Sequence, residues 1–419
     1  MLTLVDPPIS DANAPEDAPL FGLPFVLKDT WDTVGVRTTG GSYRHRARVP
    51  LESAPIYPAL LKAGAVLLGK SNIGDLAFSA ESDNYLIGTT KNPHDPSRTS
   101  GGSTGGGAAA VAAGMAAFEW GTDFGGSIRI PAAFCGVVGL RLSAATWPVE
   151  RAHFPRVSPR FWSFLGMGPL ARDVATCRRV LAAVPSLRRE GVGPAPLIEK
   201  NRVVIYPPDR LLRRAWPTFE QDATDALVRA GVKALRAQGL PSPTRAGRAF
   251  DGYLCAHFSD FVGADELSLF DGLVAAIVGA ASGGRLDKRL HPKGAALFSL
   301  TALGRLTLFR DKARATRRLE EVRAAFRRVW DEGLLIVLPT STVPASRHGR
   351  TTFDLRLLSF AKIGNLTDAT ALALPFGRFP DGLPRSLQIL GPPGSEAAVL
   401  DLAERLEDSG KTSGLGRHA

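Results

Sequence analysis

Three polar residues have the types and surroundings that nucleophilic catalysis needs. Lys28 ends an apolar run, Ser103 lies in a Gly- and Ser-rich segment, and Ser127 follows two glycines. A serine hydroxyl is a weak nucleophile until a neighbouring base takes its proton. A lysine can be that base when burial lowers its pKa and leaves the amine neutral. The three residues could therefore supply the nucleophile and the base of a hydrolase.

Each of these segments has an ordinary explanation when it is taken alone. A lysine at the end of a strand usually just reaches solvent, and a Gly-rich segment is usually a linker. The segment 100–107, however, runs straight into the Ala-rich stretch 108–117, which a linker would not do. The two glycines before Ser127 would let the backbone approach a ligand closely.

Other hydrolytic schemes fit the sequence poorly. The pattern G-x-S-x-G, which marks the nucleophile of α/β-hydrolases, is absent around Ser127. His94 follows Asn-Pro and is expected to be a loop residue, and no histidine has a recognisable triad context. The sequence has no His-Glu-x-x-His run, the helical motif of many zinc hydrolases. We therefore predict a reaction without a metal or a cofactor.

The segment 64–71 satisfies the phosphate-loop pattern G-x-x-x-x-G-K-[ST] letter for letter. A phosphate loop follows a strand, and its backbone N–H groups turn inward toward the phosphates. Here the preceding segment, 54–63, has the apolar spacing of a helix, and the middle residues 65–68 are Ala-Val-Leu-Leu, which favour a strand. We therefore predict a buried strand that ends near the surface at Lys70, and no nucleotide site.

Taken together, the three candidate segments resemble the amidase signature family. In that family a Gly-Gly-Ser-Ser-Gly-Gly loop precedes a Gly-x-Asp-x-Gly-Gly-Ser-Ile-Arg-x-Pro loop by a fixed interval. The matching serines here, Ser103 and Ser127, are 24 residues apart, with no gap needed. The resemblance is strong over 22–142, moderate over 330–405 and faint between. It implies an α/β fold with a central mixed β-sheet covered by helices on both faces.

The resemblance also implies a role for each matched residue. Ser127 would be the nucleophile, Ser103 would relay the proton from a cis peptide bond after Gly102, and Lys28 would be the base. Asp123 and Arg129 would be charges that hold the loop. The oxyanion of the transition state would be bound by the backbone N–H groups of four successive residues: Phe124, Gly125, Gly126 and Ser127.

The sequence departs from the family pattern at several positions. Thr104 replaces the second serine of the Gly-rich loop; it keeps a hydroxyl, but its methyl group crowds the site. Gly107 stands where a larger residue is common. The segment 143–163 matches little in the family, and we expect it to shape the pocket for the acyl group.

Strands and helices are expected to alternate along the chain, which favours a layered α/β fold. We predict strands at 22–27, 65–68, 203–205 and 334–338, helices at 54–63, 108–117, 223–238, 313–332 and 395–406, and a loop over 120–130. The expected organisation is a loose leader over 1–21, an amidase signature domain over 22–408 with a helical cap at 245–310, and a flexible tail over 409–419.

The composition is that of a globular protein, with 419 residues, 44% hydrophobic and 22% charged. The net charge of +11 is carried by scattered arginines without stacking aromatic residues, so a solvated basic face is expected and a nucleic-acid partner is not.

The three cysteines lie far apart, which suits a reducing compartment. The start of the chain does not resemble a signal peptide, and no uncharged apolar run reaches the roughly 18 residues of a membrane helix. We expect a cytoplasmic protein, for which a homodimer is compatible.

The function implied by the resemblance is an amidase that hydrolyses a linear carboxamide through a serine acyl-enzyme. Two catalytic alternatives remain open. One is the amidase component of a glutamine-dependent amidotransferase, which would pass ammonia to a partner that binds tRNA; the faint central match and the short N-terminus disfavour it. The other is an acyltransferase of the same fold. A non-catalytic scaffold is disfavoured because Lys28, Ser103 and Ser127 are all present.

Overall fold

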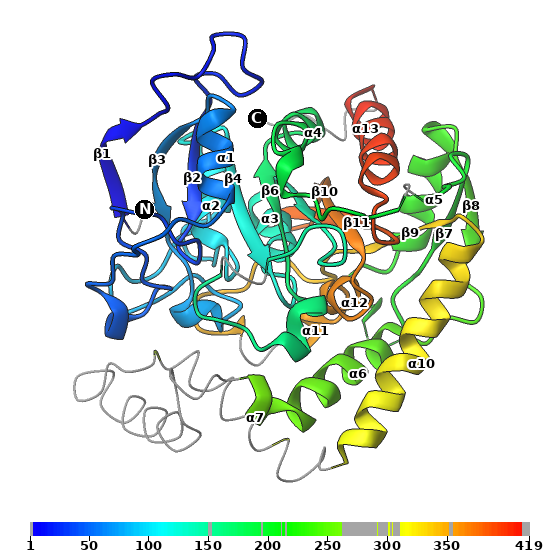
Figure 1. Ribbon diagram of the computed structural model, residues 1–419. Coiled ribbons are helices and arrows are strands. Elements are labelled where there is room, and N and C mark those ends of the chain that lie inside the picture. Colours follow the sequence, from blue (N-terminus) through cyan, green and yellow to red (C-terminus); the bar gives the residue numbers. More distant parts are fainter. Residues whose placement is uncertain are drawn as a thin grey trace.

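The computed structural model describes residues 3–149, 153–193, 196–210, 212–213, 216–261, 291, 301, 304, 311–351 and 355–412. Its strands form one mixed 11-stranded sheet with the order β1-β3-β2-β4-β6-β5-β10-β11-β9-β7-β8 (Figure 1). The strands are β1 (Thr3–Ile9), β2 (Pro24–Lys28), β3 (Val66–Ser71), β4 (Phe118–Asp123), β5 (Val138–Arg141), β6 (Gly166–Ala171), β7 (Arg202–Ile205), β8 (Lys233–Arg236), β9 (Leu335–Pro339), β10 (Thr370–Arg378) and β11 (Pro384–Gly391).

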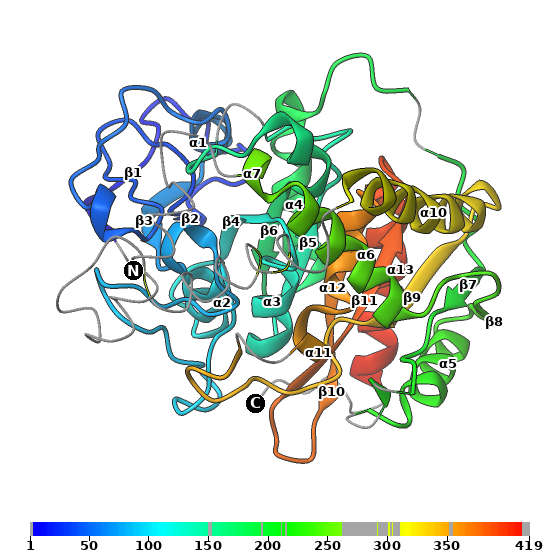
Figure 2. The same ribbon diagram turned by 90° about the horizontal axis from the view of Figure 1, so that it is seen from below.

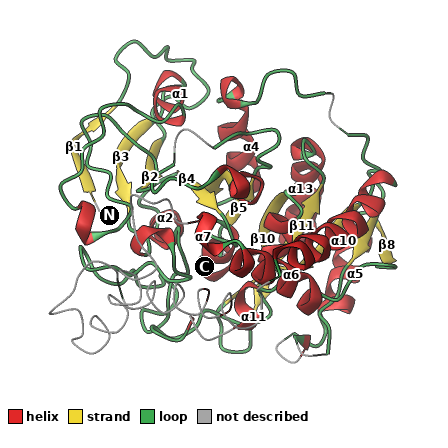
Figure 3. Cartoon of the chain, turned by 60° about the horizontal axis from the view of Figure 1, so that its bottom comes forward, coloured by secondary structure: helices red, strands yellow, loops and turns green. Residues whose placement is uncertain are grey.

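Helices cover both faces of this sheet, as predicted, and Figure 3 shows the strands enclosed between them. The helices are α1 (Ile56–Lys62), α2 (Gly105–Ala112), α3 (Arg129–Cys135), α4 (Val174–Ala182), α5 (Phe219–Arg229), α6 (Pro243–Ala256), α7 (Phe258–Phe261), α10 (Lys312–Asp331), α11 (Leu355–Leu358), α12 (Ala361–Leu366) and α13 (Glu396–Thr412). No helix in the described part of the chain is long and apolar enough to cross a membrane.

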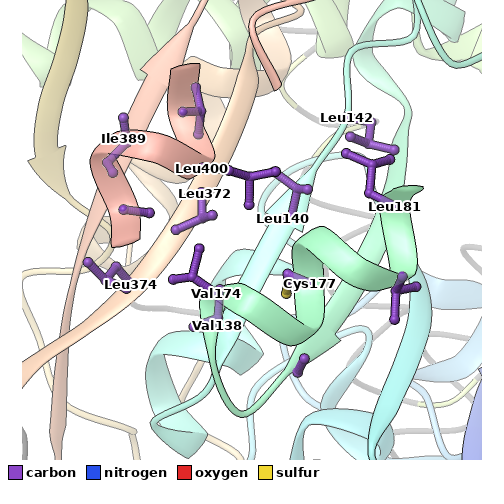
Figure 4. Packing of buried hydrophobic residues seen from close by; sticks show 14 of the residues in the cluster. Val138, Leu140, Leu142, Val174, Cys177, Leu181, Leu372, Leu374, Ile389 and Leu400 are labelled. Carbon is purple, nitrogen blue, oxygen red and sulfur yellow. The ribbon is translucent and has the colours of Figure 1, made fainter. Parts of the chain in front are cut away.

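Strand periodicity divides the core between the two faces, because successive side chains of a strand point to opposite sides. In β9, Leu335 and Val337 are buried in the cluster that includes α1, α4, α5 and α13. The alternate residues Ile336 and Leu338 are buried on the other face, against α6, α10 and α12. Figure 4 shows the first of these clusters, where strand side chains meet α4. Figure 2 shows α6 and α10 side by side, in agreement with their direct packing.

Small residues let α2 and α3 lie close to the sheet. The cluster between these helices and the strands is built from Ala108, Val111 and Ala132 together with Ile128 and Leu170. Because α2 carries Ala and Gly almost throughout, it can approach β2 and β4 closely. This close approach brings the Gly-rich loop before α2 to the ends of both strands.

Several predicted boundaries differ from the structure. The expected loop over 120–130 is a strand up to Asp123 and helical from Arg129, so only five residues connect β4 to α3. The expected helix over 223–238 ends at Arg229, and β8 follows after Gly231, whose φ of 69° suits glycine at a helix end. The helix expected over 108–117 lies earlier, over 105–112.

The expected leader differs from the structure, and the expected tail and cap are described only in part. The leader that we expected to be loose contains β1, which pairs antiparallel with β3 at the sheet edge. The helix α13 continues to Thr412, and residues 413–419 of the expected tail lie outside the described residues. Of the expected cap at 245–310, α6 and α7 are described, and most of the rest lies outside the described residues. The proposed domain limits remain a prediction.

The phosphate-loop pattern is a strand, as predicted. β3 lies between β1 and β2, and its last residues include Lys70. Lys70 is not near the surface, however, because β1 and the segment after β2 enclose it. Its amine donates to the carbonyl of Trp31 and to Thr38 Oγ1 at 2.9 Å, and lies 3.9 Å from Asp29. A lysine held in this way serves the packing of the strand rather than a phosphate.

We predict that Lys70→Met lowers the free energy of unfolding by about 3–5 kcal/mol, because it leaves buried Asp29 without its cation. Denaturant unfolding would measure this, with the exposed Lys62→Met as the matched control. MgATP should leave the melting temperature of the parent chain unchanged. A rise in melting temperature with MgATP that is lost in Lys70→Met would contradict the prediction that this segment binds no nucleotide.

Candidate active site

The sheet register places Lys28 on the face that α2 covers. Lys28 is the last residue of β2. Phe25 and Leu27 of the same strand are buried on the opposite face, in the cluster of α1 and α4. Successive strand residues alternate between faces, so Val26 and Lys28 point toward α2, and Val26 packs there against Ala110. A side chain that leaves a central strand in this direction ends among protein atoms, and Lys28 is fully buried.

Three oxygen atoms surround the Lys28 amine. Lys28 Nζ lies 2.9 Å from Ser103 Oγ, 2.8 Å from the carbonyl oxygen of Thr122 and 3.0 Å from Thr122 Oγ1. Burial lowers the pKa of Lys28 to about 7, against the opposing effect of the carboxylates of Glu119 and Asp123. The amine is therefore available in its neutral form near neutral pH, which is the state that a base requires.

Ser103 reaches Lys28 from the loop that precedes α2. The Gly102–Ser103 peptide bond is cis, as the resemblance implied. Gly102 has no room for a side chain, because a Cβ there would lie 2.5 Å from the backbone nitrogen of Glu81. Ser82 ties the loop down: its hydroxyl donates to the Ser103 carbonyl at 3.0 Å and accepts from the Gly105 N–H at 2.8 Å. These contacts fix the backbone that carries the Ser103 hydroxyl.

Ser127 lies in the short connection between β4 and α3, and its side chain is partly exposed. The Thr104 N–H donates to the Ser127 carbonyl at 3.2 Å, so the two serine-bearing loops are joined directly. Among the described contacts, no hydrogen bond joins the Ser127 and Ser103 hydroxyls. The structure thus contains the Lys28–Ser103 contact that the expected relay needs, whereas the Ser103–Ser127 contact and the relay itself remain predictions.

The loop before Ser127 is shaped by the Asp123 carboxylate. Asp123 accepts from the N–H groups of Gly126 at 2.8 Å and Ile128 at 3.0 Å. The Gly126 N–H, which we expected in the oxyanion hole, is therefore already engaged by protein. The N–H groups of Gly125 and Ser127 have no partner among the described residues and are available to a ligand. Phe124 lies beside them, partly exposed, against the aromatic rings of Phe161, Phe164 and Phe250.

Asp123 is itself held by a buried ion pair with Arg129. The two side chains form two contacts, of 2.9 and 3.0 Å, and both are fully buried. Arg129 also donates to Asn365 at 2.7 Å and to Gln388 at 3.0 Å, which links the loop to α12 and β11. Burial alone would raise the pKa of Asp123, but Arg129 holds that pKa below its usual range. The carboxylate therefore stays charged.

Thr104, which replaces the family's second serine, fits the site without a clash. Its Oγ1 donates to the Thr122 carbonyl at 3.4 Å. Its methyl group lies 2.9 Å from where a Cβ on Gly121 would stand. The glycine at position 121 thus accommodates the methyl group whose crowding we expected.

Glu119, a fully buried carboxylate in β4, was not among the predicted site residues. Phe118 and Trp120, on either side of it, point to the opposite face, so Glu119 shares the α2 face with Lys28. One of its oxygens accepts from the Ser71 hydroxyl, and the other has no partner among the described residues. Burial raises the pKa of Glu119 to about 8, so it is largely uncharged near neutral pH.

Glu119 explains why position 107 is a glycine. A Cβ on Gly107 would lie 1.2 Å from Glu119 Oε2, so the carboxyl group fills the space of the missing side chain. From the sequence, a contact between Gly107 and Glu119 could have been inferred only if α2 and β4 had been known to face each other. His153 was expected only as part of the segment 143–163, which we expected to shape the acyl pocket, and its ring lies 3.2 Å from Thr122 Oγ1.

Known proteins similar to this chain include amidases and the A component of an amidotransferase. The family model described as Amidase matches residues 9–400. The chain is 32% identical to the A component of glutamyl-tRNA(Gln) amidotransferase of Moorella thermoacetica, over 93% of this chain and 83% of that protein. It is 30% identical to the amidase-named protein AmiB2 of Mycobacterium tuberculosis, over 95% of this chain and 84% of that protein. The crystal structure of the A component of glutamyl-tRNA(Gln) amidotransferase from Thermotoga maritima has the same fold, with a TM-score of 0.74 and 22% identity over 97% of this chain and 87% of that one.

We predict that Gly107→Ala lowers the free energy of unfolding by about 1–3 kcal/mol, the usual cost of overpacking a buried site. Glu119→Ala in the same chain should recover much of this loss, because it empties the space that the new methyl group needs. Denaturant unfolding of the two single variants and the double variant gives the coupling energy. Gly193→Ala, where nothing lies near the added Cβ, is the control. Additive effects of the two substitutions would contradict the contact.

Proposed function

The chain belongs to the amidase family, and from that membership we propose that it hydrolyses a carboxamide bond through an acyl-enzyme on Ser127. The observation that carries the proposal is the buried Lys28 amine, 2.9 Å from Ser103 Oγ, with its pKa lowered to about 7. A buried lysine that pairs with a serine hydroxyl near a second, accessible serine provides a base, a relay and a nucleophile.

In the proposed acylation, neutral Lys28 takes the proton of Ser103 while Ser103 takes the proton of Ser127. The Ser127 oxygen attacks the amide carbon, and the carbonyl oxygen becomes an oxyanion. In this proposal the N–H groups of Gly125 and Ser127 bind the oxyanion, and one such donor is worth about 2.7–4 kcal/mol in the transition state. The proton returns through Ser103 to the amide nitrogen, and the amine leaves.

In the proposed deacylation, water replaces the amine and the same groups work in the same order. Lys28 takes a proton through Ser103 from the water that attacks the ester carbonyl. The tetrahedral intermediate then collapses, and the proton returns to Ser127 as the acid leaves. A linear carboxamide is the substrate class that we propose, as we expected from the resemblance of the sequence to the family.

A second candidate function is the glutaminase component of an amidotransferase. The observation that favours it is the 32% identity to a protein named as the A component of glutamyl-tRNA(Gln) amidotransferase. Such a component would use the same Lys28, Ser103 and Ser127, and would transfer the released ammonia to a partner. An acyltransferase would share the acyl-enzyme and differ only in using an amine instead of water.

The proposed roles predict a specific pattern of rate losses. Ser127→Ala should abolish reaction with a fluorophosphonate, because no other atom can form the covalent bond. Ser103→Ala and Lys28→Met should each lower the labelling rate by roughly 10²–10⁴-fold, the usual range for a general base. The double variant should lose little more than either single variant, because residues that act as one unit give non-additive losses. Lys91→Met, at an exposed lysine, is the control.

The labelling rate should also depend on pH in a defined direction. The neutral form of Lys28 is the base, and its pKa is about 7, so the rate should rise through about pH 7 and level off above it. Lys28→Met should show a low rate without this rise. An unchanged pH profile in Lys28→Met, with full labelling, would mean that another group is the base.

The purified chain should hydrolyse simple amides without a partner protein. A panel of aryl, alkyl and peptide amides, with glutamine among them, would be followed by ammonia or amine release and by the mass of the acylated protein. Turnover of several amides supports a free-standing amidase. Turnover of glutamine alone, and only after a partner is added, would instead support the amidotransferase function.

A further inference from the structure

A chain of hydrogen bonds leads from the Lys28 amine to His153. His153 Nδ1 lies 2.8 Å from the carbonyl oxygen of Pro155, and His153 Nε2 lies 3.2 Å from Thr122 Oγ1. A carbonyl oxygen can only accept, so Nδ1 must carry the proton. In a neutral imidazole the other nitrogen is then an acceptor, and the Thr122 hydroxyl donates to Nε2.

This assignment fixes the role of the Thr122 hydroxyl toward Lys28. Because its only proton points to His153, its oxygen faces the Lys28 amine as an acceptor, at 3.0 Å. The Thr122 carbonyl is a second acceptor, at 2.8 Å. A neutral amine has two N–H groups and one lone pair. With both N–H groups donating to Thr122, the lone pair is left for the third neighbour, Ser103 Oγ, at 2.9 Å.

We propose that His153 is a positioning residue that, through the Thr122 hydroxyl, directs the lone pair of neutral Lys28 toward Ser103. The proposal rests on the function proposed above, in which Lys28 is the base. Without an acceptor at position 153, the Thr122 hydroxyl can turn its proton toward the Lys28 lone pair. The base would then be occupied by Thr122 and unavailable to Ser103.

The backbone around His153 holds the ring in place. His153 pairs with Trp31 in an antiparallel bridge, and the next residue, Phe154, donates from its N–H to the Thr30 carbonyl at 2.8 Å. The indole ring of Trp31 meets the imidazole edge-on, with ring centroids 6.3 Å apart. His153 and Phe154, from the segment 143–163 that matches little in the family, thus lie against the residues that follow the strand end carrying Lys28.

The imidazole of His153 is neutral throughout the pH range in which Lys28 can act as a base. Burial lowers the pKa of His153 to about 4; the charge of Lys28 lowers it further, and Asp32 opposes this. On the Lys28 side, Glu119 and Asp123 raise the pKa of the amine. Deprotonation of Lys28 at about pH 7 therefore takes place beside a neutral His153 with a fixed tautomer.

Three variants distinguish the hydrogen bond between Thr122 and His153 from the packing of the His153 ring against Trp31. His153→Phe keeps a ring of similar shape against Trp31 and removes both nitrogens. His153→Gln keeps an acceptor, and Thr122→Val removes the hydroxyl in the middle of the chain. Two quantities would be measured in each variant: the pH midpoint of Lys28, from the ¹³Cε resonance of labelled lysine assigned with Lys28→Met, and the fluorophosphonate labelling rate at alkaline pH.

In His153→Phe the midpoint of Lys28 should fall by about one pH unit, since the Thr122 hydroxyl then favours the neutral amine over the charged one. The labelling rate at alkaline pH should fall by roughly 10–100-fold, by analogy with the loss seen when the partner that orients a metal ligand is removed. His153→Gln should retain most of both values. Adding His153→Phe to Thr122→Val should change neither value further.

An unchanged Lys28 midpoint and labelling rate in His153→Phe would overturn the proposal. So would a loss of melting temperature alone, because that would show a packing role. If the parent chain is not labelled at Ser127, the function proposed above fails, and the Lys28 titration still decides whether His153 acts on the amine.

Discussion

The Lys28 amine is enclosed at the end of a central strand by Ser103 and by two oxygens of Thr122, with distances of 2.8 to 3.0 Å. Charging an amine in such a place costs free energy, because water is replaced by a few fixed dipoles. The rest of the site follows from this burial. The small residues of α2 allow it, the Gly-rich loop supplies the hydroxyl that meets the amine, and β4 supplies the acceptors. Burial thus turns an ordinary strand-end lysine into a candidate base.

The charged groups near Lys28 do not cancel the lowering of its pKa by burial. Asp123 is the nearby permanent anion, and its charge is already matched by Arg129 at 2.9 Å. Glu119 lies earlier in the same strand, and burial raises its pKa to about 8, so near neutral pH it is mostly a neutral acid. The pKa of Lys28 stays at about 7 against the raising effects of Glu119 and Asp123. The guanidinium of Arg129 also bonds to Asn365 and Gln388, so it links the loop of Ser127 to α12 and β11.

Features that depend on residues close together in the sequence could be predicted from it, whereas features that depend on residues far apart could not. Lys28, Ser103 and Ser127 were found because short motifs carry them, and β2 and β9 were found because their apolar runs are local. β8 was missed because Gly231 divides one amphipathic stretch into a helix and a strand. Lys70 was expected near the surface because nothing local indicates that β1 covers the sheet edge there. Glu119, His153 and Asn365 act through contacts with residues far along the chain, and the alternation Phe-Glu-Trp in β4 is equally typical of an exposed strand face.

In the proposed mechanism buried Lys28 acts on Ser127 through Ser103, which requires a direct contact between the hydroxyls of Ser103 and Ser127. A crystal structure of the protein after reaction with a fluorophosphonate tests that contact directly. The account predicts a covalent bond from Ser127 Oγ to phosphorus, with the phosphoryl oxygen at the N–H groups of Gly125 and Ser127. It also predicts Ser103 Oγ within hydrogen-bond distance of both Lys28 Nζ and Ser127 Oγ. An adduct on another residue, or a Ser103 hydroxyl turned away from Ser127, would contradict it.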